Sequence, residues 1–502
     1  MKENNKPELL LPSGNTESFN AALEGGADAV YLGLRNFNAR RNAPNFTNEQ
    51  LFSIRRLLSE RQKKLYITLN TLIKQTELPA VLDTLNFISS LKPDAMIIQD
   101  LGVLHITKKY FPGIKIHSST QMTVHNSTGA EFLRKQGVER VILARELSLE
   151  EIRKISERSK IELEVFIHGA LCYSLSGACL FSSFIGSHSA NRGLCTQPCR
   201  RLFEGKNGSG YYFSLKDQQQ TENIPELAKI GVRSLKIEGR MKSADYVYKT
   251  ANIYRRLIDG EITPAEAQTE LATETGREKT AYFMSGDLGD AFTDSANTGI
   301  KAGYITNISG DEITFNCEVE RNNIKRIRIV AKNGKQKSVK LKNYEVEGDL
   351  ITYKGDSKDI RKGDEVFIAG YKEKHFSGKI DENVKPKIKD FSGKRKNKII
   401  NSLKNNRKQK GRQIYLRINN LKWIRKIKFD EVDKIIASFS FKEMEKFNTE
   451  IPVIKNNLNK FIFELPLFIG ENRQDDYKKV ISELMKKGIR SLSVSQLFQT
   501  VL

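Results

Sequence analysis

The first 260 residues repeat one pattern, a short apolar segment followed by an amphipathic one, and this repetition limits the folds open to the chain. Each apolar segment is rich in aliphatic and β-branched side chains and is bounded by turn or polar residues, as is typical of a strand in a parallel sheet. The eight segments are Glu8–Pro12, Ala29–Gly33, Leu65–Asn70, Ala95–Gln99, Ile114–Ser118, Arg140–Ala144, Leu163–Ile167 and Ser234–Glu238.

The intervening segments have the pattern of helices. Asn15 offers a cap before an apolar stripe that includes Phe19, and Ser148 with Glu151 forms a capping-box pattern. Eight strands alternating with helices over about 240 residues predict a TIM-like (β/α)8 barrel. An open doubly wound sheet is the alternative, although no glycine-rich dinucleotide loop follows the first strand. Tyr211–Asp217 is a possible ninth strand.

The pattern changes after the predicted barrel. Short strands with Gly-Asp turns predict the hairpins of a small β-barrel domain or sandwich. A Lys-, Arg- and Asn-rich stretch without an apolar period predicts a flexible basic linker, and the last 90 residues return to an α/β pattern. We therefore expect a barrel at 1–275, a small β domain at 276–375, a linker at 376–412 and a C-terminal α/β segment at 413–502.

Positive charge is concentrated in the last quarter of the chain. The net charge of the whole chain is +23, and residues 376–502 alone contain 29 Lys and Arg against 14 Asp and Glu, an excess of 15. A local positive field of this size favours a polyanion, for which RNA or DNA is the usual candidate. The alternative is a compositional drift in which the lysines are only solvated.

Neither a membrane span nor a signal peptide is expected. The sequence contains no run of about 18 or more apolar residues, and the polar N-terminus leads directly into the first predicted strand. We therefore expect a cytoplasmic protein without a membrane partner. Thiols are kept reduced in the cytoplasm, so the cysteines are not expected to form disulfides.

Four of the five cysteines fall within 28 positions, in the spacing C-x6-C-x15-C-x3-C, and the first follows a predicted strand. Four thiolates can hold a zinc ion or a [4Fe–4S] cluster. Structural zinc sites usually use C-x2-4-C pairs, so the wide first pair favours the cluster. Zinc and unligated or catalytic thiols remain as alternatives. The predicted ligands are Cys172, Cys179, Cys195 and Cys199, whereas Cys317 is expected to be a buried apolar residue.

Polar residues follow other strand ends, where a barrel places its chemistry. Asn70, His117, Gln121 and Arg145 are the candidate substrate-binding residues. Arg145 and Arg240 could each grip a carboxylate, and His168 or Glu238 could move protons, so His168, Glu238 and Arg240 are the candidate catalytic residues. A histidine at a strand end is more often structural, and Glu238 could simply form an ion pair with Arg240.

The segment from Glu164 to Ser182, EVFIHGALCYSLSGACLFS, resembles the signature of the collagenase-like peptidase family, number thirty-two among the peptidases of unknown catalytic type. Similar matches extend over about residues 8–255. They are Glu8-Leu-Leu-Leu-Pro, Gly26-Ala-Asp-Ala-Val-Tyr-Leu-Gly, Gln99-Asp-Leu-Gly, His117-Ser-Ser-Thr-Gln-Met, Leu143-Ala-Arg-Glu-Leu-Ser, Arg192-Gly-Leu-Cys-Thr-Gln-Pro-Cys-Arg and Lys236-Ile-Glu-Gly-Arg-Met-Lys.

The resemblance implies an RNA-modifying enzyme despite the family name. One branch forms 5-hydroxycytidine in 23S rRNA, another hydroxylates the wobble uridine of tRNA, and a third takes part in ubiquinone hydroxylation. In these relatives the four matching cysteines bind a [4Fe–4S] cluster, and the RNA enzymes depend on prephenate as an oxygen source. The long tail of this chain resembles the ribosomal-RNA branch more than the compact transfer-RNA branch, but it is short for the former.

Two other functions remain as alternatives. A collagenase-like peptidase is one, although the sequence has neither a His-Glu-x-x-His helix nor a Gly-x-Ser-x-Gly elbow. A zinc-stabilised, non-catalytic RNA-binding factor is the other. We predict an iron–sulfur- and prephenate-dependent hydroxylase that acts on a pyrimidine of rRNA or tRNA.

Overall fold

The computed structural model describes residues 6–501 except 42, 207, 294–298, 332–334, 372–375, 377, 379, 382–383 and 404–410. The chain divides into two compact units. One contains the residues up to Thr123 together with 142–148 and 162–390, and the other contains 124–141, 149–161 and the residues from Phe391 onward.

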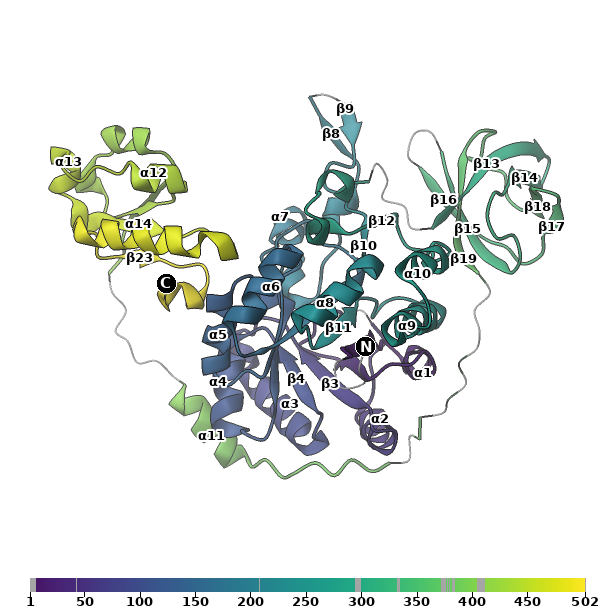
Figure 1. Cartoon of the computed structure of the whole chain (residues 1–502), viewed down its shortest axis with the longest axis horizontal. Coiled ribbons are helices and arrows are strands. Elements are labelled where there is room, and N and C mark those ends of the chain that lie inside the picture. Colours follow the sequence, from purple (N-terminus) through teal and green to yellow (C-terminus); the bar gives the residue numbers. More distant parts are fainter. Residues whose placement is uncertain are drawn as a thin grey trace. The chain divides into compact units, whose positions relative to one another are not determined.

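Eight parallel strands form a closed barrel (Figure 1). Closure is visible in the pairing of the last strand, which hydrogen-bonds in parallel with both the first and the seventh. The TIM-like barrel predicted from the sequence is therefore confirmed. Its strands are β1 (Glu8–Pro12), β2 (Ala29–Gly33), β3 (Lys64–Leu69), β4 (Ala95–Ile98), β5 (Ile116–Ser118), β6 (Arg140–Ile142), β7 (Glu162–Ala170) and β11 (Ser234–Ile237).

Helices alternate with these strands. The Asn15 side chain caps the first helix by accepting the Ser18 N–H at 2.8 Å, and Thr47 caps the second in the same way, through the N–H of Gln50. The capped helix predicted at Asn15 is thus confirmed. The helices are α1 (Thr16–Glu24), α2 (Asn48–Glu60), α3 (Leu78–Leu91), α4 (Leu101–Tyr110), α5 (Ser127–Lys135), α6 (Leu149–Arg158), α8 (Ile224–Ile230) and α9 (Ala244–Asp259).

The barrel interior is filled by side chains from at least six strands, and it also contains one ion pair. The buried apolar cluster comprises Leu10, Ala29, Tyr31, Tyr66, Ala95, Ile97, Ile142 and Phe166. Lys236 Nζ lies 3.0 Å from Glu164 Oε1 and 4.3 Å from the ring centre of Tyr31, with both charged side chains buried. A buried charge is tolerated when it is paired in this way.

The chain between β7 and β11, together with the stretch after α9, adds elements outside the barrel. Strand β10 (Asp217–Gln219) runs antiparallel to β7, and β12 (Lys279–Thr280) pairs with β10. The other elements are α7 (Phe181–Gly186), the hairpin of β8 (Phe203–Gly205) and β9 (Gly208–Gly210), and α10 (Pro264–Leu271). The possible ninth strand at Tyr211–Asp217 is wrong, because only its last residue belongs to β10.

A seven-stranded antiparallel sheet follows in the order β16-β15-β19-β13-β14-β18-β17. Glycines with positive φ, Gly310 (φ 61°) and Gly348 (φ 57°), turn two of its hairpins. Cys317 is fully buried in the core of this sheet, as predicted. The strands are β13 (Ile300–Ser309), β14 (Glu312–Asn316), β15 (Ile324–Val330), β16 (Gln336–Lys340), β17 (Glu345–Glu347), β18 (Leu350–Lys354) and β19 (Glu365–Tyr371).

The C-terminal segment is built on four parallel strands in sequence order: β20 (Tyr415–Ile418), β21 (Lys434–Ala437), β22 (Phe461–Glu464) and β23 (Leu492–Ser493). Its helices are α12 (Phe441–Glu445), α13 (Pro452–Lys455) and α14 (Gln474–Lys486). The expectation of a flexible linker at 376–412 is wrong in part, because helix α11 (Gly393–Ser402) forms within it. Ser392 caps α11 and Ile399 is buried, while 404–410 lie outside the described residues.

Within the second unit, a glutamate from the C-terminal segment caps helix α5. The buried Glu471 carboxylate accepts the N–H of Ser127 at 2.7 Å and its hydroxyl at 2.8 Å. Arg158 of α6 donates to the same carboxylate at 3.1 Å. The free N–H groups of a helix N-terminus favour a negative partner, so the Glu471 carboxylate stabilises α5. The contact joins residues more than 300 positions apart in the sequence.

None of the helices in the described ranges has the length and apolar character needed to cross a lipid bilayer.

The buried pair in the barrel interior gives a stability prediction. Glu164→Gln removes the carboxylate charge that lies 3.0 Å from Lys236, and breaking a buried ion pair costs about 3–5 kcal/mol of unfolding free energy. We expect a clearly lower urea midpoint by circular dichroism. The exposed Glu222→Gln is the matched control. A shift for Glu164→Gln no larger than the control's would contradict this role.

Candidate functional site

Glu238 follows β11 and lies between two arginines. Its Oε1 is 3.0 Å from Nη2 of Arg40, its Oε2 is 3.8 Å from Nη2 of Arg145, and its side chain is 14% exposed. Burial alone would raise the pKa of Glu238, but Arg40 and Arg145 hold it below its usual value. The carboxylate is therefore ionised at neutral pH. The alternative of a Glu238–Arg240 ion pair is wrong, because Arg40 and Arg145 hold this carboxylate.

Arg240 is a buried cation surrounded by neutral groups. It donates to Asn38 Oδ1 at 3.1 Å, to Thr68 Oγ1 at 3.3 Å and to Asn45 Oδ1, and no carboxylate of the described residues contacts it. Burial lowers its pKa to about 10, so it remains charged at neutral pH. Gly33 makes room for the guanidinium, since a Cβ there would lie 2.4 Å from Nη2.

Arg145 is fixed by two contacts beside the end of β7. It donates to the Ala170 carbonyl at 2.9 Å, and its guanidinium lies 4.3 Å from the ring centre of Phe166. Arg40 and Arg145 both pair with Glu238, whereas Arg240 contacts only neutral groups among the described residues. Glu146 is a second buried carboxylate, and it interacts electrostatically with Arg145.

His168 is not placed where the strand alternation predicts it. The register of β7 and β11 shifts by one residue between Lys236, which pairs with Phe166, and Ile237, which pairs with His168. The ring of His168 is fully buried against helix α9, with Nδ1 3.3 Å from the Tyr254 hydroxyl. Burial lowers its pKa and favours the neutral imidazole. This position argues against direct contact with a substrate.

The other candidate substrate-binding residues have structural contacts. Asn70 accepts the N–H of Ala39 at 3.0 Å and so fixes the loop that carries Arg40. His117 packs edge-on against Tyr66, with the ring centres 4.8 Å apart. Gln121 supports the cysteine loop through its backbone, and its buried Oε1 has no hydrogen-bond partner among the described residues.

The loop from Cys172 to Cys179 is tied to the barrel. The Thr123 hydroxyl donates to the Ser176 carbonyl at 2.5 Å, and the Ser176 hydroxyl donates to Glu146 at 3.2 Å. Gly177 has φ of 79°, and a Cβ on it would lie 2.0 Å from the Gln121 carbonyl oxygen. Only glycine fits this position without displacing the loop.

The segment carrying Cys195 and Cys199 is held mainly by Arg200. Arg200 donates to the Leu171 carbonyl at 2.8 Å and to the Ser214 hydroxyl at 3.1 Å, which links three stretches of chain. The N–H of Gln197 donates to Cys195 Sγ at 3.3 Å. Burial raises the pKa of Cys199, and the nearby charge of Arg200 offsets part of that rise.

The four cysteines interact electrostatically with one another and with the arginines. Burial raises the pKa of Cys172, Arg145 lowers it, and Cys179 and Cys199 raise it. Burial also raises the pKa of Cys199, which interacts with Cys195 and Cys179 as well. Cys172 is therefore near enough to Cys179, Cys199 and Arg145 for their charges to affect it, and Cys199 is near enough to Cys195.

Two metal groups use four thiolates, a zinc ion and a [4Fe–4S] cluster. No three His, Cys, Asp or Glu side chains in the described part of the chain are close enough around one point to hold a metal ion. A zinc ion needs its sulfurs at about 2.3 Å. A [4Fe–4S] cluster also takes four thiolates, which it binds through several iron atoms.

Aromatic side chains surround the cysteine segments, and several are exposed. Phe184 is 91% exposed, and Tyr173, Tyr212 and Phe292 are each about half exposed. The Tyr173 and Phe213 ring centres are 5.1 Å apart in an edge-to-face contact. Exposed ring faces of this kind are available for stacking against a planar group.

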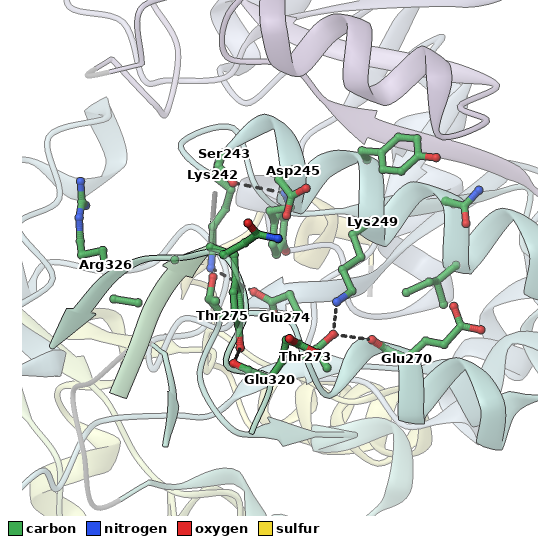
Figure 2. A pocket seen from close by; sticks show the side chains of 18 of the residues that line it. Lys242, Ser243, Asp245, Lys249, Glu270, Thr273, Glu274, Thr275, Glu320 and Arg326 are labelled. Atoms are coloured by element: carbon green, nitrogen blue, oxygen red, sulfur yellow. Dashed lines mark hydrogen bonds and ion pairs between the residues drawn. The ribbon is translucent and has the colours of Figure 1, made fainter. Parts of the chain in front are cut away.

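A separate polar pocket of about 800 Å³ is lined by α9, the residues after α10 and the antiparallel sheet (Figure 2). Its wall includes Glu274, whose carboxylate lies 3.7 Å from Lys242 Nζ and 3.8 Å from His168 Nε2. Lys249 and Thr273 are hydrogen-bonded on the same wall. The cysteines do not line this pocket.

Sequence reasoning missed Arg40 and Arg200. Arg40 lies in a loop after β2 with another arginine beside it, and no local pattern indicates which one turns toward Glu238. Arg200 directly follows the last cysteine of the cluster, and its adjacency to Cys199 was the one available signal.

The sequence of this chain is similar to those of several known proteins. The model of Peptidase family U32 matches residues 14–301. An uncharacterized protease of Methanocaldococcus jannaschii is 34% identical over 82% of this chain and 98% of its own length. The 23S rRNA 5-hydroxycytidine C2501 synthase of Escherichia coli is 35% identical over 61% of this chain and 50% of its own length. The tRNA hydroxylation protein P1 of Bacillus subtilis is 35% identical over 51% of this chain and 63% of its own length.

The fit of Gly177 against Gln121 gives a testable prediction. Gly177→Ala puts a Cβ into the Gln121 carbonyl and requires an unfavourable φ, so the loop should detach from the barrel. We expect faster hydrogen–deuterium exchange in residues 171–180 and unchanged exchange in the barrel strands. Gly113→Ala is the matched control, because nothing lies within 4 Å of its added Cβ. Unchanged exchange in 171–180 would show that the contact does not hold the loop.

Proposed function

The chain belongs to peptidase family U32, and from that premise we propose that it hydroxylates a pyrimidine base of RNA, either cytidine in 23S rRNA or uridine in tRNA. The observation that carries the proposal is the attachment of the cysteine segments to two arginines: Arg145 donates to the Ala170 carbonyl and Arg200 to the Leu171 carbonyl, directly before Cys172. The names of two relatives, an rRNA 5-hydroxycytidine synthase and a tRNA hydroxylation protein, support the reaction class. Since RNA is the proposed substrate, we expect the protein in the cytoplasm.

In this proposal Cys172, Cys179, Cys195 and Cys199 hold a [4Fe–4S] cluster, which would supply one-electron redox chemistry when bound. Bringing four thiolates together is opposed by burial and by their mutual repulsion, which raise the pKa values of Cys172 and Cys199. Arg200 and Arg145 offset part of that charge. The Gln197 N–H at Cys195 Sγ is the kind of contact that tunes a cluster's potential.

Prephenate, a dicarboxylate, is the proposed co-substrate and oxygen source. In this proposal the arginines at the mouth hold the two carboxylates of such a molecule. A guanidinium can hold a carboxylate through two parallel hydrogen bonds. Glu238 is kept ionised by its arginine partners, and in this proposal its fixed negative charge positions Arg40 and Arg145 at the mouth.

The proposed RNA substrate requires the reactive base to leave its stack in order to reach the barrel mouth. The exposed rings of Tyr173, Phe184, Tyr212 and Phe292 provide faces on which bases can stack near the cysteines. The excess of 15 positive charges in residues 376–502 would bind the phosphate backbone.

A peptidase is less well supported by the site. A cysteine peptidase needs a histidine beside its nucleophile. In the described residues His168 contacts Tyr254 and Glu274 instead of a cysteine. The thiols also couple to one another, whereas a nucleophile would be a single activated thiolate.

The proposed reaction can be tested in cells. Deletion of the gene should remove one 5-hydroxypyrimidine from ribosomal or transfer RNA, as measured by nucleoside mass spectrometry. Expression of the wild-type chain should restore it, and Glu238→Gln should restore it poorly. Persistence of every hydroxylated pyrimidine in the deletion strain would contradict the proposed function.

The proposed cluster can be tested by comparing two cysteines. Cys195→Ala removes one proposed ligand, so protein purified without oxygen should lose the brown colour and the broad visible absorbance of a thiolate-bound cluster. Cys317→Ala is the matched control, because Cys317 is buried in the core of the antiparallel sheet. Equal spectra for the two variants would exclude Cys195 as a ligand.

A further inference from the structure

The C-terminal α/β segment contains a pocket of about 840 Å³ that the proposed reaction does not use. It lies where β20 and β21 end, at Asn419 and Ser438, with the connection between the two strands forming the rest of its wall. Parallel sheets bind ligands at the carboxyl ends of their strands. The volume is within the range of small-molecule and nucleotide sites.

Trp423, the only tryptophan of the chain, lines this pocket and is 50% exposed. Tryptophan is mostly buried in folded proteins, so an exposed indole in a pocket is informative. The ring is carried on a short 3-10 helix, Leu421–Lys426, which Asn420 caps and Ile424 anchors in the core. Its position is therefore fixed by the fold.

The charges around Trp423 are mainly positive. The lining residues include Arg417, Lys426 and Lys428 against one carboxylate, Glu431. Glu431 pairs with Lys428 at 3.1 Å, and Arg417 pairs with Glu464 at 2.6 Å. Lys426 lies 5.2 Å from the Trp423 ring centre and contacts no carboxylate in the described part of the chain. An aromatic ring beside an unpaired cation is the arrangement that binds single-stranded nucleic acid.

We propose that this pocket binds a nucleotide of single-stranded RNA, with the base against Trp423 and the phosphate held by Lys426. The choice of RNA over another anion rests on the proposed function, and the net charge of this part of the chain agrees with it. The pocket would hold a strand flanking the modified base and would add affinity without taking part in the chemistry.

The single tryptophan makes a direct test possible. Short single-stranded RNA should quench the fluorescence of the full chain when tryptophan is excited selectively, and the quenching should saturate. Inorganic polyphosphate at the same ionic strength should not quench, because it has no base to stack. If RNA binds, as measured by anisotropy of a labelled strand, without quenching Trp423, the proposed pocket is wrong.

Single substitutions distinguish the contribution of base stacking to RNA affinity from the contribution of charge. Trp423→Ala should weaken binding of labelled single-stranded RNA about 5- to 100-fold, and Trp423→Phe should weaken it less, because a ring remains. Lys426→Gln should lower the salt slope of binding by about 0.7. Lys479→Gln removes a charge from α14, away from the pocket, and should leave the quenching by RNA intact. Equal affinities for Trp423→Ala and wild type would overturn the proposal.

Binding and hydroxylation fail independently in these experiments. The binding assay needs neither the cluster nor prephenate. An absence of quenching by RNA, with hydroxylation intact, would therefore contradict only the proposed pocket. If RNA quenches Trp423 but deletion of the gene leaves every 5-hydroxypyrimidine in place, only the proposed reaction is wrong. An RNA-binding role for the pocket is then supported.

Discussion

The hydrogen bonding of β11 to both β1 and β7 is the constraint on which the site depends. Without that closure, Glu238 and Arg240 would lie at one end of an open sheet, and the cysteine segments after β7 would lie at another. Closure instead brings Arg40, Arg145, Glu238 and Arg240 to the end of the barrel at which the cysteine loop begins. The register shift between β7 and β11 acts locally, because it directs His168 away from that mouth and leaves Lys236 in the interior.

Electrostatics then determine what the mouth can hold. The arginines beside Glu238 favour anions, and desolvation raises the pKa of the Cys172 and Cys199 thiols, so these thiols resist ionisation until a positive group offsets their charge. In the proposed function, a dicarboxylate would bind to the arginines and iron would bind to the thiols. Arg145 interacts with both the Glu238 carboxylate and the cysteine thiols: it contacts Glu238, and its charge offsets part of the rise in the pKa of Cys172.

Much of this arrangement could be predicted from the sequence because the signals are local. Strands β1 and β2 have the predicted bounds, and Asn15 caps α1 as expected. The position of His168 could not be predicted, since a one-residue shift in pairing reverses which face a side chain takes. Arg40 was missed because its contact with Glu238 spans 198 positions. Helix α11 was missed because polar residues surround its one buried side chain, Ile399.

The content of iron and acid-labile sulfide in the wild-type chain tests the central claim most directly. Protein purified and analysed without oxygen should contain about four irons and four sulfides per chain, together with little zinc. A preparation that contains neither iron nor sulfide, or one zinc per chain, would contradict the account of the barrel mouth given above.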